Sequence, residues 1–253
     1  MIRRSPILVS LFMVLGLAAS AGAANSAPAY IDAAVNDASR PAADKTRDAD
    51  RKPADMLVFA AVKPGAKVAD IIPGGGYFTR LFAKAVGPKG HVYAFVPDEL
   101  LKKRATAADG IKALAADPGY SNLSVTEGPV SGFSAPEALD LAWTSQNYHD
   151  LHNWVSPEDL AAFNKAVFAA LKPGGIYVVL DHVAAAGAPA DVTETLHRID
   201  PAVVKNEVTA AGFQFDGASD VLKHPADDHT AKVFDAGVRG KTDQFILKFR
   251  KPK

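Results

Sequence analysis

The sequence predicts an α/β fold, a doubly wound and mostly parallel seven-stranded sheet whose last strand is antiparallel. From Met56 onward, short apolar runs that suit buried strands alternate with longer segments that suit helices. This order is typical of a parallel sheet with helices on both faces. The last two strand candidates have no long helix between them, which indicates an antiparallel final strand.

The expected elements follow from apolar runs and their flanking residues. Strands are predicted at residues 67–72, 91–96, 123–127, 138–144, 176–181, 213–222 and 244–250. Helices are predicted to end at residue 62 and to span residues 77–86, 100–117, 157–171 and 201–211. Ser156, Pro157 and Asp159 form the start signal of one helix, and Gly212 follows the end of another.

Residues 1–23 have the features of a secretory signal peptide. Arg3 and Arg4 precede an apolar run over residues 7–19, and Ala21-Gly22-Ala23 matches a small-residue cleavage site. The run is shorter than the ~20 residues that span a bilayer. We therefore expect no stable membrane anchor and a periplasmic or secreted protein, exported by the general secretory or the twin-arginine route.

The mature chain divides into an extension and a domain. Residues 24–55 hold few large apolar side chains, so we expect short helices that lie over the surface, with Arg47, Asp48 and Arg51 in surface ion pairs. Residues 56–253 form the α/β domain.

Charge and composition exclude several classes of protein. Lysine and arginine total 28, as do aspartate and glutamate, so a broad phosphate-binding face for nucleic acid is not expected. The chain has no cysteine, which excludes disulfides, thiolate metal sites and thiol catalysis. A small molecule is the expected partner, and no pattern indicates an oligomeric state.

A glycine-rich turn joins the first predicted strand to a helix in VADIIPGGGYFTR. Gly74, Gly75 and Gly76 let the backbone approach a ligand closely, and free N–H groups at the helix start favour an anionic or polar group. Asp70 lies in an otherwise apolar strand and is expected to hydrogen-bond the turn, while Tyr77 edges the ligand. The alternative is a tight turn that binds nothing.

Histidines and acids gather in four short segments, His149-Asp150-x-His152, Asp181-His182, His197-x-x-Asp200 and Asp227-Asp228-His229. The first two follow the fourth and fifth predicted strands. Carboxyl ends of parallel strands open on one face, where ligands bind. We therefore expect these two segments to converge near the glycine turn.

Three interpretations of this convergence remain open. The first is a divalent metal site with His149, His152, Asp181 and His182 as ligands. The second is acid–base catalysis by His149 or His182 beside a carboxylate such as Asp150. The third is a structural role in which the histidines hold loops in place.

Longer segments carry a resemblance to a known family. VADIIPGGGYFTRLFAKAVGPKGHVYA, ALDLAWTSQNYHDLHNW and AVFAALKPGGIYVVLDH resemble motif I, the fourth strand with its loop, and the fifth-strand unit of class I S-adenosylmethionine-dependent methyltransferases. The likeness covers about residues 56–250. The strings PGGGYFTR, NYHDLH, DHVAAAG, LHRID, ADDHT and RGKTDQF are similar to a set of exported bacterial proteins called predicted methyltransferases.

The resemblance implies a Rossmann-like methyltransferase fold, S-adenosylmethionine as cofactor and methyl transfer to a small molecule. His149, Asp150 and His182 are the implied catalytic residues, with His149 or His182 taking the acceptor's proton. The implied cofactor-binding residues are Asp70, Gly74, Gly75, Gly76, Tyr77, Asp98 and Asn147.

Three positions depart from the family pattern. Ile72 stands at the first glycine of G-x-G-x-G, and Val96 stands where an acid holds the ribose, with Asp98 nearby. Gly128-Pro129 replaces the Asp that often follows the third strand. Two alternatives therefore stand beside methyl transfer: an exported metal-dependent enzyme that uses the His/Asp face, and a non-catalytic protein that binds a small metabolite.

Overall fold

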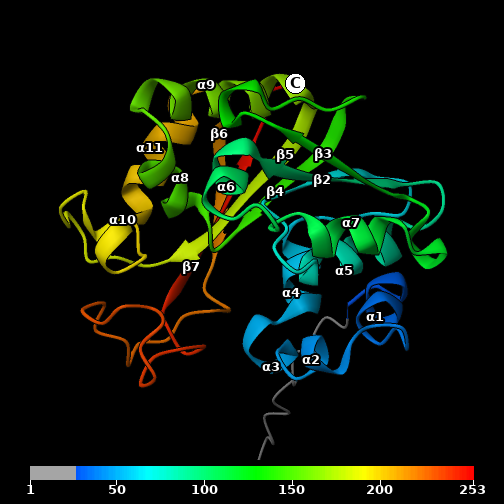
Figure 1. Cartoon of the computed structure of the whole chain (residues 1–253), viewed down its shortest axis with the longest axis horizontal. Helices are drawn as coiled ribbons and strands as arrows, with labels where there is room; N and C mark the ends of the chain where they lie inside the picture. Colours follow the sequence, from blue (N-terminus) through cyan, green and yellow to red (C-terminus); the bar gives the residue numbers. More distant parts are fainter. Residues whose placement is uncertain (1–26) are drawn as a thin grey trace, which may run out of the picture.

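The computed structural model describes residues 27–253, so the predicted signal peptide lies outside the described residues. A seven-stranded sheet runs through the middle of the domain in the order β3-β2-β1-β4-β5-β7-β6 (Figure 1). The five strands β1 to β5 are parallel, and β7 pairs antiparallel with both β5 and β6. The predicted fold class is confirmed. The strands are β1 Lys67–Ile71, β2 His91–Pro97, β3 Leu123–Gly128, β4 Leu139–Ser145, β5 Leu171–His182, β6 Gln214–Ser219 and β7 Gln244–Arg250.

Helices cover both faces of this sheet. The α-helices are α1 Ala29–Val35, α2 Ala42–Lys45, α3 Asp48–Arg51, α4 Pro53–Phe59, α5 Tyr77–Val86, α6 Asp98–Lys103, α7 Asp109–Ala115, α8 Tyr148–Trp154, α9 Pro157–Ala170, α10 Val192–Thr195 and α11 Pro201–Ala210. Two short 3-10 helices, η1 Pro118–Tyr120 and η2 Val130–Gly132, complete the described elements. None of the helices between residues 27 and 253 has the length and apolar character that crossing a membrane requires.

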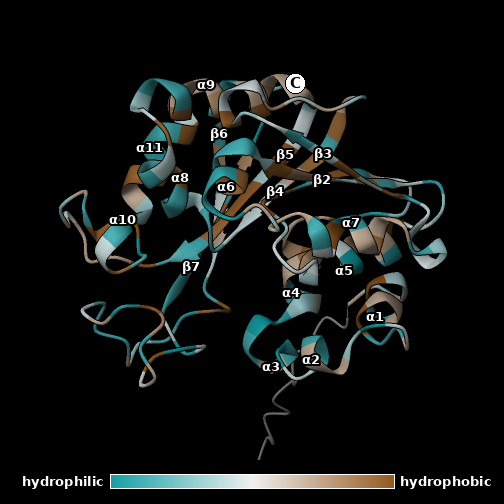
Figure 2. Cartoon of the chain, in the orientation of Figure 1, coloured by the Kyte–Doolittle hydropathy of each residue, from teal (hydrophilic) through white to brown (hydrophobic). Residues whose placement is uncertain are grey.

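The sheet separates two apolar layers, and the strands are the most hydrophobic part of the domain (Figure 2). Alternation along each strand sends successive side chains to opposite faces. Val68 and Trp143 pack with α1, α4, α5 and α7, while Ala69 and Tyr177 pack with α8, α9 and α11. The first helix of the extension joins the core through Ile31, which is 1% exposed.

Two predicted segments differ from the structure. The helix predicted over residues 100–117 is two helices, α6 and α7, separated where Arg104 adopts an extended conformation. The break directs Leu100 and Arg104 toward the carboxyl ends of the strands, while Ile111 packs in the core. The segment after β4, predicted as a loop, contains the helix α8. Tyr148 and Leu151 are buried on one face of α8, since residues three apart share a helix face.

Candidate functional site

The turn after β1 adopts backbone conformations that favour glycine. Gly74 and Gly76 have φ values of 56° and 80°, and Ile72 has a φ of 57°. The left-handed region costs a β-branched residue roughly 1–3 kcal/mol unless neighbours hold it. The Ile72 amide donates to the carbonyl of Phe95 at 2.9 Å, and its carbonyl accepts from Asn147 Nδ2 at 3.0 Å. Ile72 therefore keeps the backbone shape that a glycine would take.

The three glycines of this turn have different surroundings. A Cβ atom on Gly74 or Gly75 would meet nothing within 4 Å, and both residues line a cavity. A Cβ on Gly76 would lie 3.1 Å from Leu114 and 3.3 Å from Ile111 of α7. Gly76 therefore allows α7 to approach the start of α5. Of the three glycines predicted to bind the cofactor, Gly74 and Gly75 face the cavity.

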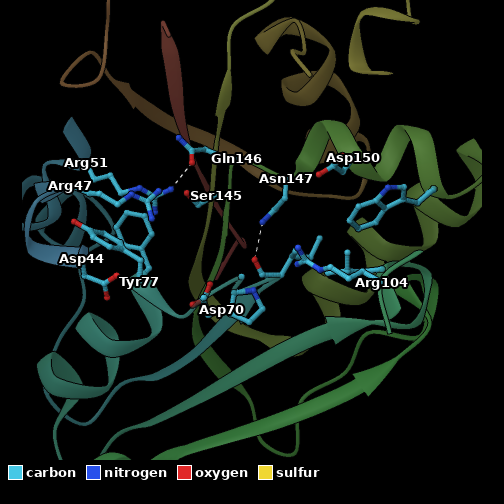
Figure 3. A pocket seen from close by; sticks show the side chains of 17 residues that line it. Asp44, Arg47, Arg51, Asp70, Tyr77, Arg104, Ser145, Gln146, Asn147 and Asp150 are labelled. Carbon is cyan, nitrogen blue, oxygen red and sulfur yellow. Dashed lines mark hydrogen bonds between the residues drawn. The ribbon is translucent and has the colours of Figure 1, made fainter. Parts of the chain in front are cut away.

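This cavity, of about 470 Å³, lies at the carboxyl ends of β1 and β4 (Figure 3). Its volume is in the range of small-molecule sites. Arg47, Arg51 and Tyr77 form one side, and Arg104 and Asp150 form the other. The lining residues are Asp44, Arg47, Arg51, Asp70, Ile72, Pro73, Gly74, Gly75, Tyr77, Phe78, Leu100, Arg104, Ser145, Gln146, Asn147, Asp150 and Trp154.

Asp70 reaches the cavity from the end of β1. Its carboxylate accepts a hydrogen bond of 2.5 Å from Thr79 Oγ1 in α5, so its partner is this helix and not the turn itself. Burial raises the pKa of Asp70 to about 7, against the lowering effects of Thr79 and Arg51. A buried carboxyl that titrates near neutrality marks a candidate functional position.

The N-terminal extension supplies cations to the cavity, which corrects the expectation of surface ion pairs. Arg51 donates to Gln146 Oε1 at 2.5 Å, and its guanidinium lies 4.7 Å from the centroid of the Tyr77 ring. Burial lowers the pKa of Arg51 to about 10. Asp48 accepts from the Tyr77 hydroxyl at 2.6 Å and from Arg40 Nη2 at 2.7 Å. The Tyr77 ring stabilises Arg51 and Arg40 in their positions beside it, because an aromatic face attracts cations.

Of the two remaining predicted cofactor-binding residues, Asn147 lies at the cavity and Asp98 does not. Asn147 lines the cavity, but its amide group donates to the Ile72 carbonyl and its oxygen accepts from Thr144. It therefore holds the turn in place. Asp98 begins α6 and is not among the cavity-lining residues; Leu100, two residues later, is.

A second group of polar side chains forms where α8 meets the end of β5. His149 is 3% exposed, and its Nδ1 donates to Asp181 Oδ1 at 2.8 Å. The His149 backbone amide donates to the other oxygen of Asp181 at 2.9 Å. Burial by itself would lower the pKa of His149, but the carboxylate of fully buried Asp181 raises it.

The other ring nitrogen of His149 faces two more ligand-type atoms. His149 Nε2 lies 3.2 Å from His197 Nδ1 and 3.6 Å from Asp150 Oδ1. The His197 and Asp150 atoms are 3.8 Å apart. We call His149, Asp150 and His197 the His–Asp–His cluster; its carboxylate also lines the cavity. The sequence indicated His197 beside an acid but gave no reason to place it here.

The structure does not gather the four predicted metal ligands. His152 Nε2 lies 3.2 Å from Glu207 of α11, and His182 Nδ1 lies 2.8 Å from Thr242 Oγ1. Burial lowers the pKa of His182 to about 4. His149 and His152 thus contact different neighbours, Asp181 of β5 and Glu207 of α11.

Comparisons with known proteins agree with this fold. No family model matches the chain. The protein-L-isoaspartate O-methyltransferase of Ignicoccus hospitalis is 35% identical over 96 residues, which are 38% of this chain and 43% of that protein. The chain thus matches less than half the length of this curated relative.

Solved structures extend the likeness to most of the chain. An S-adenosylmethionine-dependent methyltransferase from Aquifex aeolicus has a TM-score of 0.55 at 18% identity, over 81% of this chain and 95% of its own. The glycopeptide N-methyltransferase MtfA, complexed with sinefungin, has a TM-score of 0.54 at 16% identity, over 82% and 87%. The cyclase SpnF has a TM-score of 0.58 at 18% identity, over 83% and 81%. The chain therefore has the class I S-adenosylmethionine-dependent methyltransferase fold, a fold that does not by itself define the reaction.

Proposed function

We propose that this protein transfers a methyl group from S-adenosylmethionine to a small molecule. One observation carries the proposal: Gly74 and Gly75 open onto a cavity of about 470 Å³ at the carboxyl ends of β1 and β4. In open α/β sheets, ligands bind at this edge, where the strand order reverses. The distant relative supports a methyltransferase, and the solved structures support the fold on which it would act.

The residues at the glycine turn fit the methionine end of the cofactor. The space beside Gly74 and Gly75 is open, and a larger side chain at either position would occupy it. The carboxylate of the cofactor would face Arg51, whose guanidinium is held by Gln146 and by the Tyr77 ring. Charge-assisted hydrogen bonds of this kind are the stronger ones in proteins.

The acceptor would lie against the opposite wall. When bound, S-adenosylmethionine supplies an electrophilic methyl group, and the chain contributes binding, orientation and proton removal. Asp150 is the acid of the His–Asp–His cluster that lines the cavity, and burial raises the pKa of its carboxyl. We assign proton acceptance to Asp150. His149 lies 3.6 Å behind it, and His182 lines a neighbouring cavity.

Calorimetric titration of S-adenosylmethionine into the protein, with metals chelated, tests cofactor binding. We expect one-to-one micromolar binding that weakens at least about tenfold in Gly75→Val, a loss of roughly 1.4 kcal/mol. Gly110→Val is the matched control, because a Cβ at Gly110 also meets nothing within 4 Å but lies outside the cavity lining. Absence of binding at millimolar cofactor would reject the proposal and leave the fold as its only methyltransferase feature.

Export remains a separate proposal. The charged, apolar and small-residue regions within residues 1–23 support a cleaved leader. Mass spectrometry of the protein from a bacterial periplasmic fraction should find a chain that starts at Ala24. Recovery of the uncleaved chain from the cytoplasm alone would contradict this location.

A further inference from the structure

The His–Asp–His cluster has the arrangement of a metal-binding site. Its three ligand-type atoms are separated by 3.2, 3.6 and 3.8 Å. In a tetrahedral site with metal–nitrogen bonds of about 2.1 Å, neighbouring ligand atoms lie about 3.4 Å apart. The three atoms are therefore spaced as three corners of one coordination sphere. We propose that His149, Asp150 and His197 bind one divalent transition-metal ion.

The surroundings of His149 prepare it as a ligand. Its Nδ1 donates to Asp181 Oδ1 at 2.8 Å, so the neutral ring carries its proton there and presents a lone pair at Nε2. A buried carboxylate behind a metal-bound imidazole is a recurrent arrangement that fixes the tautomer and the ring orientation. Asp181 is fully buried, and its Oδ2 also accepts the His149 amide. This second contact fixes the start of α8 against β5.

His197 is held toward the cluster by its backbone and by an aromatic neighbour. Its φ of 54° is in the left-handed region, a strained conformation that is found preferentially at functional sites. The ring of Phe234, a 56% exposed residue, lies 4.8 Å from that of His197, centroid to centroid. Two chain segments that are distant in sequence therefore fix the second imidazole.

The donor set indicates the kind of ion. Two imidazoles and one carboxylate suit zinc, iron(II) or manganese(II) better than magnesium or calcium, which prefer oxygen ligands. Three protein ligands leave at least one position for water or for an oxygen of a bound molecule. Asp150 belongs to both the cluster and the cavity wall, so such a molecule would enter from the cavity. Metal binding itself does not depend on the proposed methyl transfer, and the proton acceptance assigned to Asp150 applies to the protein without metal, in which Asp150 Oδ1 is not a ligand.

A chain of hydrogen bonds, from Asp181 through His149 to His197, would also explain part of this geometry. It requires no contact from Asp150 and no affinity for metal. The two interpretations differ in one measurable property, the binding of a divalent ion by the untagged, chelator-treated protein.

Titration with Zn²⁺ and with Co²⁺, followed by calorimetry and by visible absorption of the cobalt form, measures this property. We expect one equivalent of each ion to bind at micromolar or lower concentration. His197→Asn should weaken binding at least about tenfold, and Asp181→Asn, which alters the support of His149 and also the acceptor of the His182 amide, should weaken it about 10–100-fold. Asparagine is chosen at position 197 because it tolerates a positive φ.

His152→Asn is the matched control, since His152 is about as exposed as His197 and also contacts a carboxylate, at 3.2 Å. It should bind both ions like the unaltered protein. Circular dichroism of each variant without metal checks the fold. Absence of saturable binding, unchanged affinity in His197→Asn, or an equal loss in His152→Asn would each overturn the metal site. Asp150→Asn provides a second ligand variant if His197→Asn does not fold.

Discussion

The glycine-turn cavity and the His–Asp–His cluster are neighbours that are built in opposite ways. Around the turn, polar side chains hold the backbone and one another, as Asn147 donates to the Ile72 carbonyl and Thr79 donates to Asp70, and Gly74 and Gly75 present backbone to the cavity. In the cluster, side-chain atoms face one another, and Asp181 supports them from behind. The first arrangement lies at the sheet edge where ligands bind in open α/β folds, whereas the second depends on contacts between side chains of distant segments. The likeness to solved structures therefore bears on the place of the cavity and not on the cluster.

The largest expected effect is on stability and concerns the cluster. Asp181→Ala removes the partner of buried His149 and should lower the free energy of unfolding by about 3–5 kcal/mol. Urea denaturation measures the change. Asp181→Asn, which keeps the shape and a hydrogen-bond acceptor, should cost less. An Asp181→Ala variant as stable as the unaltered protein would mean that the cluster needs no support from β5.

Asp70 gives the corresponding test for the cavity. Its pKa of about 7 is raised above the ordinary value of 3.8, so its contribution to stability is fully present below pH 3.8 and is lost as the pH rises through about 7. Relative to Asp70→Asn, the unaltered protein should lose about 3 kcal/mol of unfolding free energy between pH 4 and pH 7. Parallel urea denaturation curves for both proteins across this range isolate the effect. Identical pH dependence would show that Asp70 titrates normally.

Arg51 and Arg104 sharpen the assignment of the two cavity walls, since they lie on opposite sides (Figure 3). Arg51→Gln should weaken S-adenosylmethionine binding about tenfold, because a charge-assisted hydrogen bond to the cofactor carboxylate is lost. Arg104→Gln should change the affinity less than about twofold. Calorimetry at low ionic strength compares them, and a larger loss in Arg104→Gln would reverse the orientation of the cofactor.

The smallest expected effect concerns His152, which lies outside both regions. Its contact with Glu207 is partly exposed, and such pairs contribute about 0–1 kcal/mol. His152→Asn should therefore change the free energy of unfolding by less than about 1 kcal/mol. Thermal or urea denaturation measures it, and a larger loss would place His152 among the residues on which α8 depends.

The sequence predicted the parts of the site that follow from local pattern. A buried strand, a glycine turn and a helix start form one continuous segment, so Gly74 and Gly75 could be placed at the sheet edge. Short apolar runs likewise predicted each of the seven strands. Ile72 shows the limit of this reasoning, because its left-handed backbone depends on contacts with Phe95 and Asn147, which are distant in sequence.

The parts that the sequence did not predict depend on contacts between distant segments. α8 is seven residues long with few apolar positions, too short for a clear helical period. His197 follows a four-residue helix and meets His149 across 48 positions of sequence. Arg51 enters the cavity because the Tyr77 ring and Gln146 receive it. No local pattern encodes such a partner.

The hydrogen bond between Arg51 and Gln146 also bears on the order in which parts of the structure form during synthesis. It joins positions 95 residues apart, so the first helices leave the ribosome long before β4 exists to receive them. Closing such a long loop carries an entropic cost that the pairing of β4 with β1 must offset. Because the cavity is lined by residues between Asp44 and Trp154, a nascent chain gains it only after the fourth strand has joined the first, although β5, β6 and β7 follow later in the sequence.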